Sequence, residues 1–551
     1  MRKIILPSIL TVTALTAIFM TAVNSPASAC TNMLVTRGAS ADGSVMITYT
    51  CDGEFHPIMR YTPPEDHEPG DSLELRHWDG RLQGKIAQVA HTYGVVHLMN
   101  EHQLVIGETT FTGREELQNP EGMLHYWYLM RIALQRAKTA REAVEIMGAL
   151  VAEYGYRSTG ESISIGDKEE AWLFEIIGKG PGRKGAVWVA MRIPDGYICA
   201  HANQARIREF PMDDKENCLY APDVVDFAVE MGYYDPASGK PFSFSDAYCP
   251  SPPQKLRYCA TRVWSLFRRA APSKEFSPDY HRGVKGAEPY PLWIKPDEKL
   301  TREDVFALMR DHYEGTEYDM CKGIDAGQFC SPHRWRPMDW EIDGEIYSWE
   351  RPISTQQTGF SFVSQSRKDM PDAVGGVYWY GLDDTYFSVY VPFYACTDRI
   401  PEVFATGRMS EFSWDSGWWV FNFVANYANL RYELMKVDIQ AVQKELEGNM
   451  TAMQPAVEKA ALELYKKDPE LARVYLTDYT EAVANRVVAG YTQLAEDLIR
   501  KYNDGYVQHE PGRAQEEGYS EEWLRKVLRH HPEKYRLQRW ESDSLETDLP
   551  Y

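Results

Sequence analysis

The chain has 551 residues, of which 44% are hydrophobic and 25% charged, a composition typical of a globular protein with a large core. Aspartate and glutamate outnumber lysine and arginine by 80 to 59, which gives a formal net charge of −21. Such a chain repels phosphate backbones and anionic lipid headgroups, so its composition argues against a nucleic-acid-binding protein.

The first 29 residues predict a secretory signal peptide. Arg2 and Lys3 give a positive start, residues 4–23 are largely apolar, and Ala27-Ser28-Ala29 fits the small-x-small rule for cleavage by signal peptidase before Cys30. An uncleaved anchor stays open because the apolar run is long enough to span a bilayer. A lipoprotein acylated on Cys30 also stays open, although alanine stands where such signals usually have leucine. We expect a periplasmic or secreted protein with no stable membrane insertion after processing.

Residues 30–407 predict an α+β core. Asp42-Gly43 indicates a hairpin between the first two strands, and residues 122–150 carry apolar side chains at helical spacing. Strands combined with helices favour sheets covered by helices, a layered architecture. The strand-like runs are residues 33–36, 44–49, 95–99, 104–107, 162–165, 171–177, 186–191 and 197–200, with a strand-rich stretch at 360–393.

Residues 408–502 predict a helical C-terminal region, and residues 503–551 a polar, charged tail. Apolar side chains recur at helical spacing over Trp418–Leu446 and Leu471–Ile499, and Gly448 follows the first stretch as a stop signal. The proline-rich stretch at residues 250–253 predicts a surface connection within the preceding core.

Eight cysteines remain besides Cys30, and an even number in an exported protein permits up to four disulfides. Their spacing contains no Cys-x-x-Cys pair and no Cys/His cluster of the zinc type, so we expect neither a metal nor a cofactor. The eight are Cys51, Cys199, Cys218, Cys249, Cys259, Cys321, Cys330 and Cys396.

A cysteine at the mature N-terminus would carry two catalytic groups on one residue. The thiol of Cys30 is a nucleophile, and the α-amine, with a free pKa near 8, can accept the thiol proton. A structural cysteine near the terminus is the alternative interpretation of this feature alone.

The residues after this junction resemble the cysteine dipeptidase family, relatives of the penicillin and bile-salt acylases among the N-terminal-nucleophile hydrolases. Cys30-Thr31 is followed by Asp42-Gly43-Ser44 and then Asp52, as in that family. Tyr49 departs from the pattern, because the family often has arginine three residues before that last aspartate. Further matching blocks are Met99–His102, Ile106–Thr110, Ser158–Ser162, Trp172–Glu175, His201–Arg206, Arg262–Trp264, Ser354–Phe360, Trp379–Gly381 and Asp383-Asp384.

The resemblance implies a four-layer αββα core and hydrolysis of dipeptides without metal or cofactor. Attack by the Cys30 thiolate on the scissile carbonyl would give a tetrahedral intermediate and then a thioester, which water cleaves. The oligomeric state is not determined by the sequence.

The resemblance also assigns three supporting residues, each with an alternative. Asn203 would hold the oxyanion or orient the α-amine, or would only satisfy a loop backbone. Asp52 would partner the N-terminal ammonium, or would only cap a turn. Arg262 would polarise the thiol or bind a substrate carboxylate, or would form an ion pair on a helix surface. His201 is expected to be structural, because the α-amine serves as the base.

Two other functions stay open. An acylase could use the same nucleophile on a non-peptide amide, such as a bile-salt conjugate, a β-lactam side chain or an acyl-homoserine lactone, and would need a long apolar pocket. A non-catalytic exported lipoprotein or binding protein could keep the fold without the chemistry.

Overall fold

The computed structural model describes residues 30–53, 58–77, 79–510 and 512–537. The predicted signal peptide, residues 1–29, therefore lies outside the described residues. Among the helices that are described, none is both long enough and apolar enough to cross a membrane.

The first of two large antiparallel sheets has seven strands in the order β16-β14-β1-β2-β19-β20-β21. Its centre is the predicted hairpin, in which Leu34 pairs with Ile47. The strand bounds are β1 (Asn32–Val35), β2 (Met46–Asp52), β14 (Ile198–His201), β16 (Trp293–Ile294), β19 (Thr358–Gln365), β20 (Val377–Leu382) and β21 (Val391–Tyr394).

The second sheet has eight strands in the order β15-β13-β12-β11-β10-β9-β8-β3. It packs closely on the first, since a Cβ atom on Gly107 would come within 2.9 Å of Asn32 Nδ2, and one on Gly166 within 2.7 Å of Ile47. The bounds are β3 (Tyr61–Thr62), β8 (Val95–Val96), β9 (Met99–Asn100), β10 (Val105–Thr112), β11 (Gly160–Gly166), β12 (Ala171–Gly178), β13 (Ala186–Arg192) and β15 (Cys218–Tyr220).

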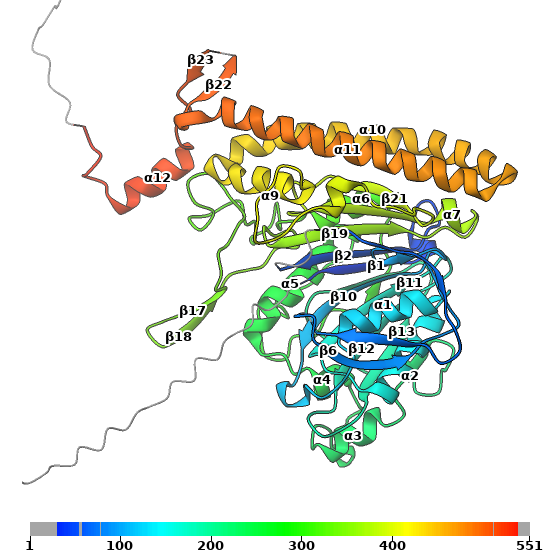
Figure 1. The fold of residues 1–551 in the computed structure, drawn as a ribbon. Coiled ribbons are helices and arrows are strands. Elements are labelled where there is room, and N and C mark those ends of the chain that lie inside the picture. Colours follow the sequence, from blue (N-terminus) through cyan, green and yellow to red (C-terminus); the bar gives the residue numbers. More distant parts are fainter. Residues whose placement is uncertain (1–29, 54–57, 78, 511, 538–551) are drawn as a thin grey trace, which may run out of the picture.

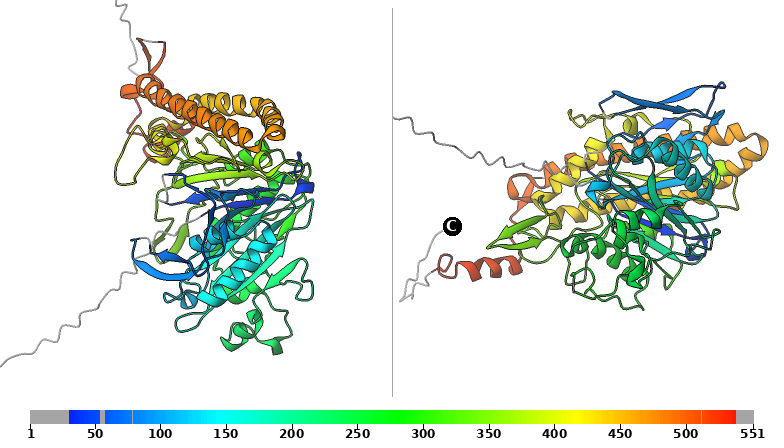
Figure 2. Two further views of the ribbon diagram at one scale, coloured as in Figure 1. Left: turned by 45° about the vertical axis from the view of Figure 1, so that its right-hand side comes forward. Right: turned by 90° about the horizontal axis from the view of Figure 1, so that it is seen from below.

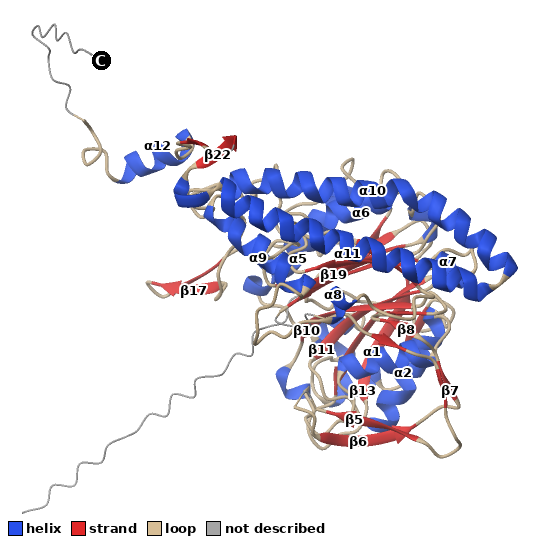
Figure 3. Ribbon diagram, turned by 45° about the horizontal axis from the view of Figure 1, so that its top comes forward, coloured by secondary structure: helices blue, strands red, loops and turns tan. Residues whose placement is uncertain are grey.

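Helices cover the outer faces of both sheets (Figure 1). Helices α1 (Tyr126–Arg136) and α2 (Ala140–Tyr154) lie on the eight-stranded sheet. The seven-stranded sheet is covered by α6 (Arg302–Met309), α9 (Gly417–Tyr427) and the long antiparallel pair α10 (Tyr432–Lys467) and α11 (Pro469–Lys501), which Figures 2 and 3 show across one side of the molecule. A buried ion pair between Arg367 and Glu458, 2.7 Å apart, ties α10 to the core.

The remaining elements are shorter or peripheral. Helix α5 (Pro253–Ala270) runs beside β14, and the hairpin of β17 (Asp339–Ile342) and β18 (Glu345–Ser348) projects from the body in Figure 1. The others are β4 (Glu65–Asp66), β5 (Ser72–Arg76), β6 (Leu82–Ala87), β7 (His91–Thr92), α3 (Val224–Glu230), α4 (Phe244–Tyr248), α7 (Asp372–Gly375), α8 (Glu402–Ala405), β22 (Val507–Glu510), β23 (Arg513–Gln515) and α12 (Glu521–His530).

The structure confirms the α+β class and the helical C-terminal region, corrects two details, and answers the open question of disulfides. The helix predicted over residues 122–150 is two helices, because Thr139 caps the start of α2 with its side chain. Pro253 does not lie in a surface connection but is the first residue of α5. Proline is tolerated there because the N–H groups of the first helical turn have no partner within the helix, so its missing N–H costs no hydrogen bond. None of the eight cysteines other than Cys30 forms a disulfide.

Candidate active site

Cys30 lies directly before β1 and is fully buried between the two sheets. Its backbone N–H donates to Asn203 Oδ1 at 3.0 Å, and its carbonyl oxygen accepts from Arg262 Nη1 at 2.6 Å. The next residue, Thr31, is bridged to Thr50 of β2. The backbone on both sides of the Cys30 Cα atom is therefore held in place.

Asn203 follows β14 in a left-handed backbone conformation, with φ of 59°, which asparagine adopts more readily than most residues. Its Oδ1 accepts from the Cys30 amide and from Arg262 Nη2 at 2.9 Å. Its Nδ2 donates to the Thr110 carbonyl at 2.7 Å. In this arrangement the side chain holds the Cys30 nitrogen and also satisfies a strand carbonyl.

Arg262 comes from α5 and is completely buried, so the alternative of an exposed ion pair on a helix surface is wrong. Besides Cys30 and Asn203, it donates to Thr31 Oγ1 at 2.9 Å. Burial, and then the charge of Arg351, lowers the pKa of Arg262 to about 10. The guanidinium fork thus joins the nucleophile, its neighbour and the asparagine in one buried network.

Asp52 ends β2 and pairs with Arg351, a residue that the sequence did not single out. Arg351 Nη2 lies 2.5 Å from Asp52 Oδ2, and Thr358 donates to the other carboxylate oxygen at 2.6 Å. Arg351 Nη1 also lies 3.4 Å from Asn203 Oδ1. Asp52 is thus not a simple turn cap. The sequence did contain a clue to Arg351, because this arginine stands three residues before the family-like block that begins at Ser354.

An acidic group faces the thiol from the opposite sheet. Glu108 Oε1, from β10, lies 3.8 Å from Cys30 Sγ and accepts a 2.5 Å hydrogen bond from the Tyr49 hydroxyl. Burial raises the pKa of the Cys30 thiol well above its usual value, and a hydrogen bond with Cys51 and the charge of Glu108 add to this. The thiol is therefore neutral in this environment, and its use as a nucleophile requires a base.

His201, the histidine closest in sequence to Asn203, is used inside the sheets. Its ring nitrogens lie 2.7 Å from Thr109 Oγ1 and 2.7 Å from Ser164 Oγ. Burial lowers the pKa of His201 to about 3, so the ring is neutral and holds two strands together.

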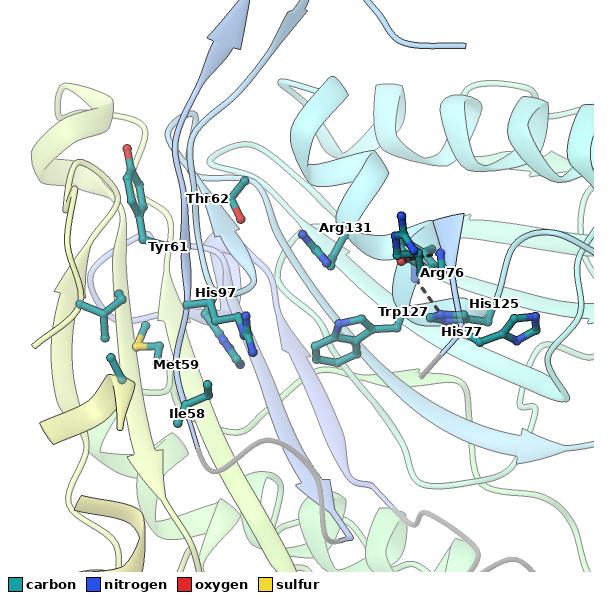
Figure 4. Close-up of a pocket in the computed structure, with 14 residues that line it drawn as sticks. Ile58, Met59, Tyr61, Thr62, Arg76, His77, His97, His125, Trp127 and Arg131 are labelled. Atoms are coloured by element: carbon teal, nitrogen blue, oxygen red, sulfur yellow. Dashed lines mark hydrogen bonds between the residues drawn. The ribbon is translucent and has the colours of Figure 1, made fainter. Parts of the chain in front are cut away.

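A cavity of about 660 Å³ lies on the side of Tyr49 away from Cys30, and its described lining includes neither Cys30 nor the residues that bond to it (Figure 4). In Figure 4, Arg131 and Trp127 reach from α1 towards His97. The ring of His97 lies 4.8 Å from that of Phe360, which lies 5.5 Å from the ring of Tyr49. Three arginines and three histidines line the cavity, and none of its described lining residues is acidic: Arg60, Arg76, Arg131, His77, His97 and His125.

Comparisons with known proteins agree on one family. The model of "Peptidase family C69" matches residues 74–445. A "Probable dipeptidase" of Latilactobacillus sakei is 25% identical over 496 residues, covering 85% of this chain and 97% of that protein. A "Probable dipeptidase" of Salmonella dublin is 27% identical over 388 residues, covering 66% and 81%. A "Dipeptidase" of Bifidobacterium longum is 28% identical over 416 residues, covering 68% and 72%. The chain belongs to peptidase family C69.

Proposed function

We propose that the protein is an exported cysteine dipeptidase of the N-terminal-nucleophile type, with Cys30 as its catalytic residue. The observation that carries the proposal is the 3.0 Å contact between the Cys30 nitrogen and Asn203, on a residue whose thiol faces Glu108 across the sheets. The two sheets stacked between helical layers, with Cys30 at the start of β1, support an N-terminal-nucleophile core. The dipeptidase names of the relatives support the substrate class.

The chemistry depends on freeing the α-amine. Residue 30 follows Ala29 in the chain, so its nitrogen is an amide and cannot accept a proton. Cleavage before Cys30 converts this nitrogen to an amine with a pKa near 8, a suitable base for the thiol beside it. The thiolate attacks the scissile carbonyl, the amine returns the proton to the leaving amine, and water hydrolyses the thioester.

The supporting residues act through position and charge. Asn203 orients the amine through Oδ1, and Arg262 fixes the Cys30 carbonyl. Asp52 neutralises and positions Arg351, which reaches the same asparagine oxygen. None of these roles requires a metal or a cofactor.

The cavity favours a substrate with a charged end. A dipeptide carries a free carboxylate close to the scissile bond, and the arginines lining the cavity suit an anion. An acylase for long acyl chains would need a long apolar pocket instead. The basic lining therefore suits an anionic substrate end, and the dipeptidase names of the relatives favour a dipeptide.

The test combines N-terminal mass analysis of the exported protein with hydrolysis of a panel of dipeptides and one long-chain acyl amide. We expect a mature protein that starts at Cys30 with a free amine and that cleaves dipeptides. Cys30→Ala should lose at least about a thousandfold in kcat, while Cys396→Ala, at a half-buried cysteine beyond β21, should retain activity. A mature chain starting elsewhere, an acylated Cys30, or activity that survives Cys30→Ala would contradict the proposal.

A further inference from the structure

Two buried carboxyl groups lie side by side next to the nucleophile, and the mechanism above uses neither. Glu108 of β10 and Glu161 of β11 are 1% and 0% exposed. The neighbouring strands place them together, because Glu161 pairs in register with Thr110, two residues beyond Glu108 on the same face of β10. Thr110 Oγ1 donates to Glu161 Oε1 at 3.0 Å.

Each of the two carboxyl groups can accept a further hydrogen bond. Tyr49 occupies Oε1 of Glu108, and Thr110 occupies Oε1 of Glu161. In the described part of the chain, no amide, hydroxyl or cationic donor reaches Oε2 of either residue. The two carboxyl groups also hydrogen-bond each other. One proton shared between them leaves further acceptor capacity on the pair, which suits a ligand that donates.

The pair carries negative charge without a cationic partner. Glu108 and Glu161 form no ion pair with an arginine, lysine or histidine of the described residues, whereas Asp52 on the neighbouring sheet has Arg351. Burial, and then the charge of Glu108, raises the pKa of Glu161 well above its usual value. Burial also raises the pKa of Glu108, although the hydrogen bonds with Tyr49, Glu161 and Cys30 oppose this rise. Glu161 is accordingly the member of the pair that holds a proton more strongly, and Glu108 the member closer to the carboxylate form.

We propose that Glu108, supported by Glu161 and Tyr49, binds the free α-ammonium group of the substrate's first residue. This inference rests on the proposed function and deepens it, because it explains why the enzyme would require an unblocked amino end. Glu108 is then a specificity-determining residue, and the arginine commonly found at position 49 in the family is replaced here by a tyrosine that orients it.

The distances suit this role. In a dipeptide the α-nitrogen is separated from the attacked carbonyl carbon only by Cα, so the two atoms lie about 2.5 Å apart. An attacking sulfur approaches that carbon to roughly 3–3.5 Å. The carboxyl group of Glu108, whose Oε1 lies 3.8 Å from Cys30 Sγ, is therefore close enough for its Oε2 to meet the ammonium group in the same complex. The ammonium has three donors, enough to reach Oε2 of both Glu108 and Glu161.

The first measurement uses the mature wild-type enzyme and two substrates of the same shape. Alanyl-alanine has the α-amine, and propionyl-alanine has hydrogen in its place. We expect kcat/KM for propionyl-alanine to be lower by about 10- to 100-fold, the usual value of a charged hydrogen bond. If both are cleaved equally well, this inference fails while the proposed function stands. If neither is cleaved, and no other dipeptide is, the proposed function fails.

The second measurement assigns the effect to Glu108. In Glu108→Gln the preference for alanyl-alanine over propionyl-alanine should fall by about 10-fold or more, mainly through KM. Glu175→Gln is the matched control, since Glu175 is a buried carboxyl on β12 that already accepts from Arg206 N at 2.6 Å and Ile207 N at 3.0 Å. Its preference should equal that of the wild type.

An equal loss for both substrates in Glu108→Gln, with the preference unchanged, would overturn the inference, because Glu108 would then act on Cys30 rather than on the substrate. If Glu108→Gln does not fold, Tyr49→Phe, which removes the hydrogen bond that orients Glu108, should lower the same preference, and an unchanged preference there would also overturn the inference. Mass analysis of each variant should show the same mature N-terminus at Cys30.

Discussion

The buried pair of Asp52 and Arg351 allows the sharpest test of how the site is held together. We consider Asp52→Asn, Arg351→Gln and the double variant, all in a Cys30→Ala background so that activity plays no part. Asparagine keeps the shape of Asp52 and can still accept from Thr358, so the first change removes mainly charge.

The expected cost follows from the geometry. The two side chains are 1% and 3% exposed, and the nearest atoms are 2.5 Å apart. With charge centres about 4 Å apart and an effective dielectric constant near 20, the attraction is about 4 kcal/mol. Removing one partner of a buried pair also leaves the other charge uncompensated, with measured costs of about 3–5 kcal/mol. Each single variant should lose about that much free energy of unfolding.

The double variant separates pairing from packing. With both charges removed, two neutral amides remain that can bond to each other, so the double variant should be more stable than the sum of the single losses predicts. We expect a coupling energy of about 2–4 kcal/mol. Urea unfolding at pH 7.5, followed by tryptophan fluorescence and analysed with a common slope, measures it.

Additive losses, or a loss below about 1 kcal/mol in Asp52→Asn, would refute the reasoning. The first outcome would mean that the two residues do not act as a pair. The second would mean that the Arg351 charge is compensated elsewhere, and that Asp52 is not needed to position it.

Three further changes test other parts of the structure. His201→Gln should retain kcat/KM to within about tenfold. Because the pKa of His201 is lowered from 6.5 to about 3, the wild type should lose free energy of unfolding as the pH falls from 6.5 towards 3. The variant should lose less over the same range, which unfolding at several pH values measures. Asp383→Asn should raise the melting temperature relative to wild type increasingly from pH 4 to pH 8, since burial raises the pKa of Asp383 from 3.8 to about 8 and wild type loses stability as pH rises through that range. Glu447→Gln should loosen α10 from the core, since Glu447 pairs with Arg310 at 2.5 Å and accepts from Tyr390 N at 2.9 Å, and limited proteolysis should then cut α10 and α11 faster.

Local signals predicted the elements well. The Asp42-Gly43 turn between two apolar runs became the β1–β2 hairpin, and the strand-like runs at residues 162–165 and 171–177 became β11 and β12, buried on both faces. The break between α1 and α2 was missed because apolar spacing continues across it, although Thr139 is a strong capping residue. Periodicity reports which face is buried and says little about where a helix stops.

The site was only partly predictable, because its residues meet through pairings far apart in the sequence. Asp52 and Arg351 are 299 residues apart, and Cys30 and Glu108 are 78 apart. Glu108 belongs to a block that resembles the family, and Tyr49 is a departure from the family pattern. No feature of the sequence around either residue predicts that their side chains meet. Their 2.5 Å contact depends on the stacking of one sheet on the other.

Under the proposed function, cleavage before Cys30 converts its amide nitrogen to an amine and leaves the contacts around Cys30 largely unchanged. The chain described here still carries Ala29, yet the Cys30 N–H already meets Asn203 and the Cys30 carbonyl already meets Arg262. An amide nitrogen has no basic lone pair, whereas a neutral amine in the same place can give one N–H to Asn203 Oδ1 and keep its lone pair for the thiol proton. Burial raises the pKa of the thiol, so under this proposal the thiol depends on the freed amine to take its proton. Under the proposed function, the fold therefore holds Cys30 in position before processing, and removal of the leader supplies the base.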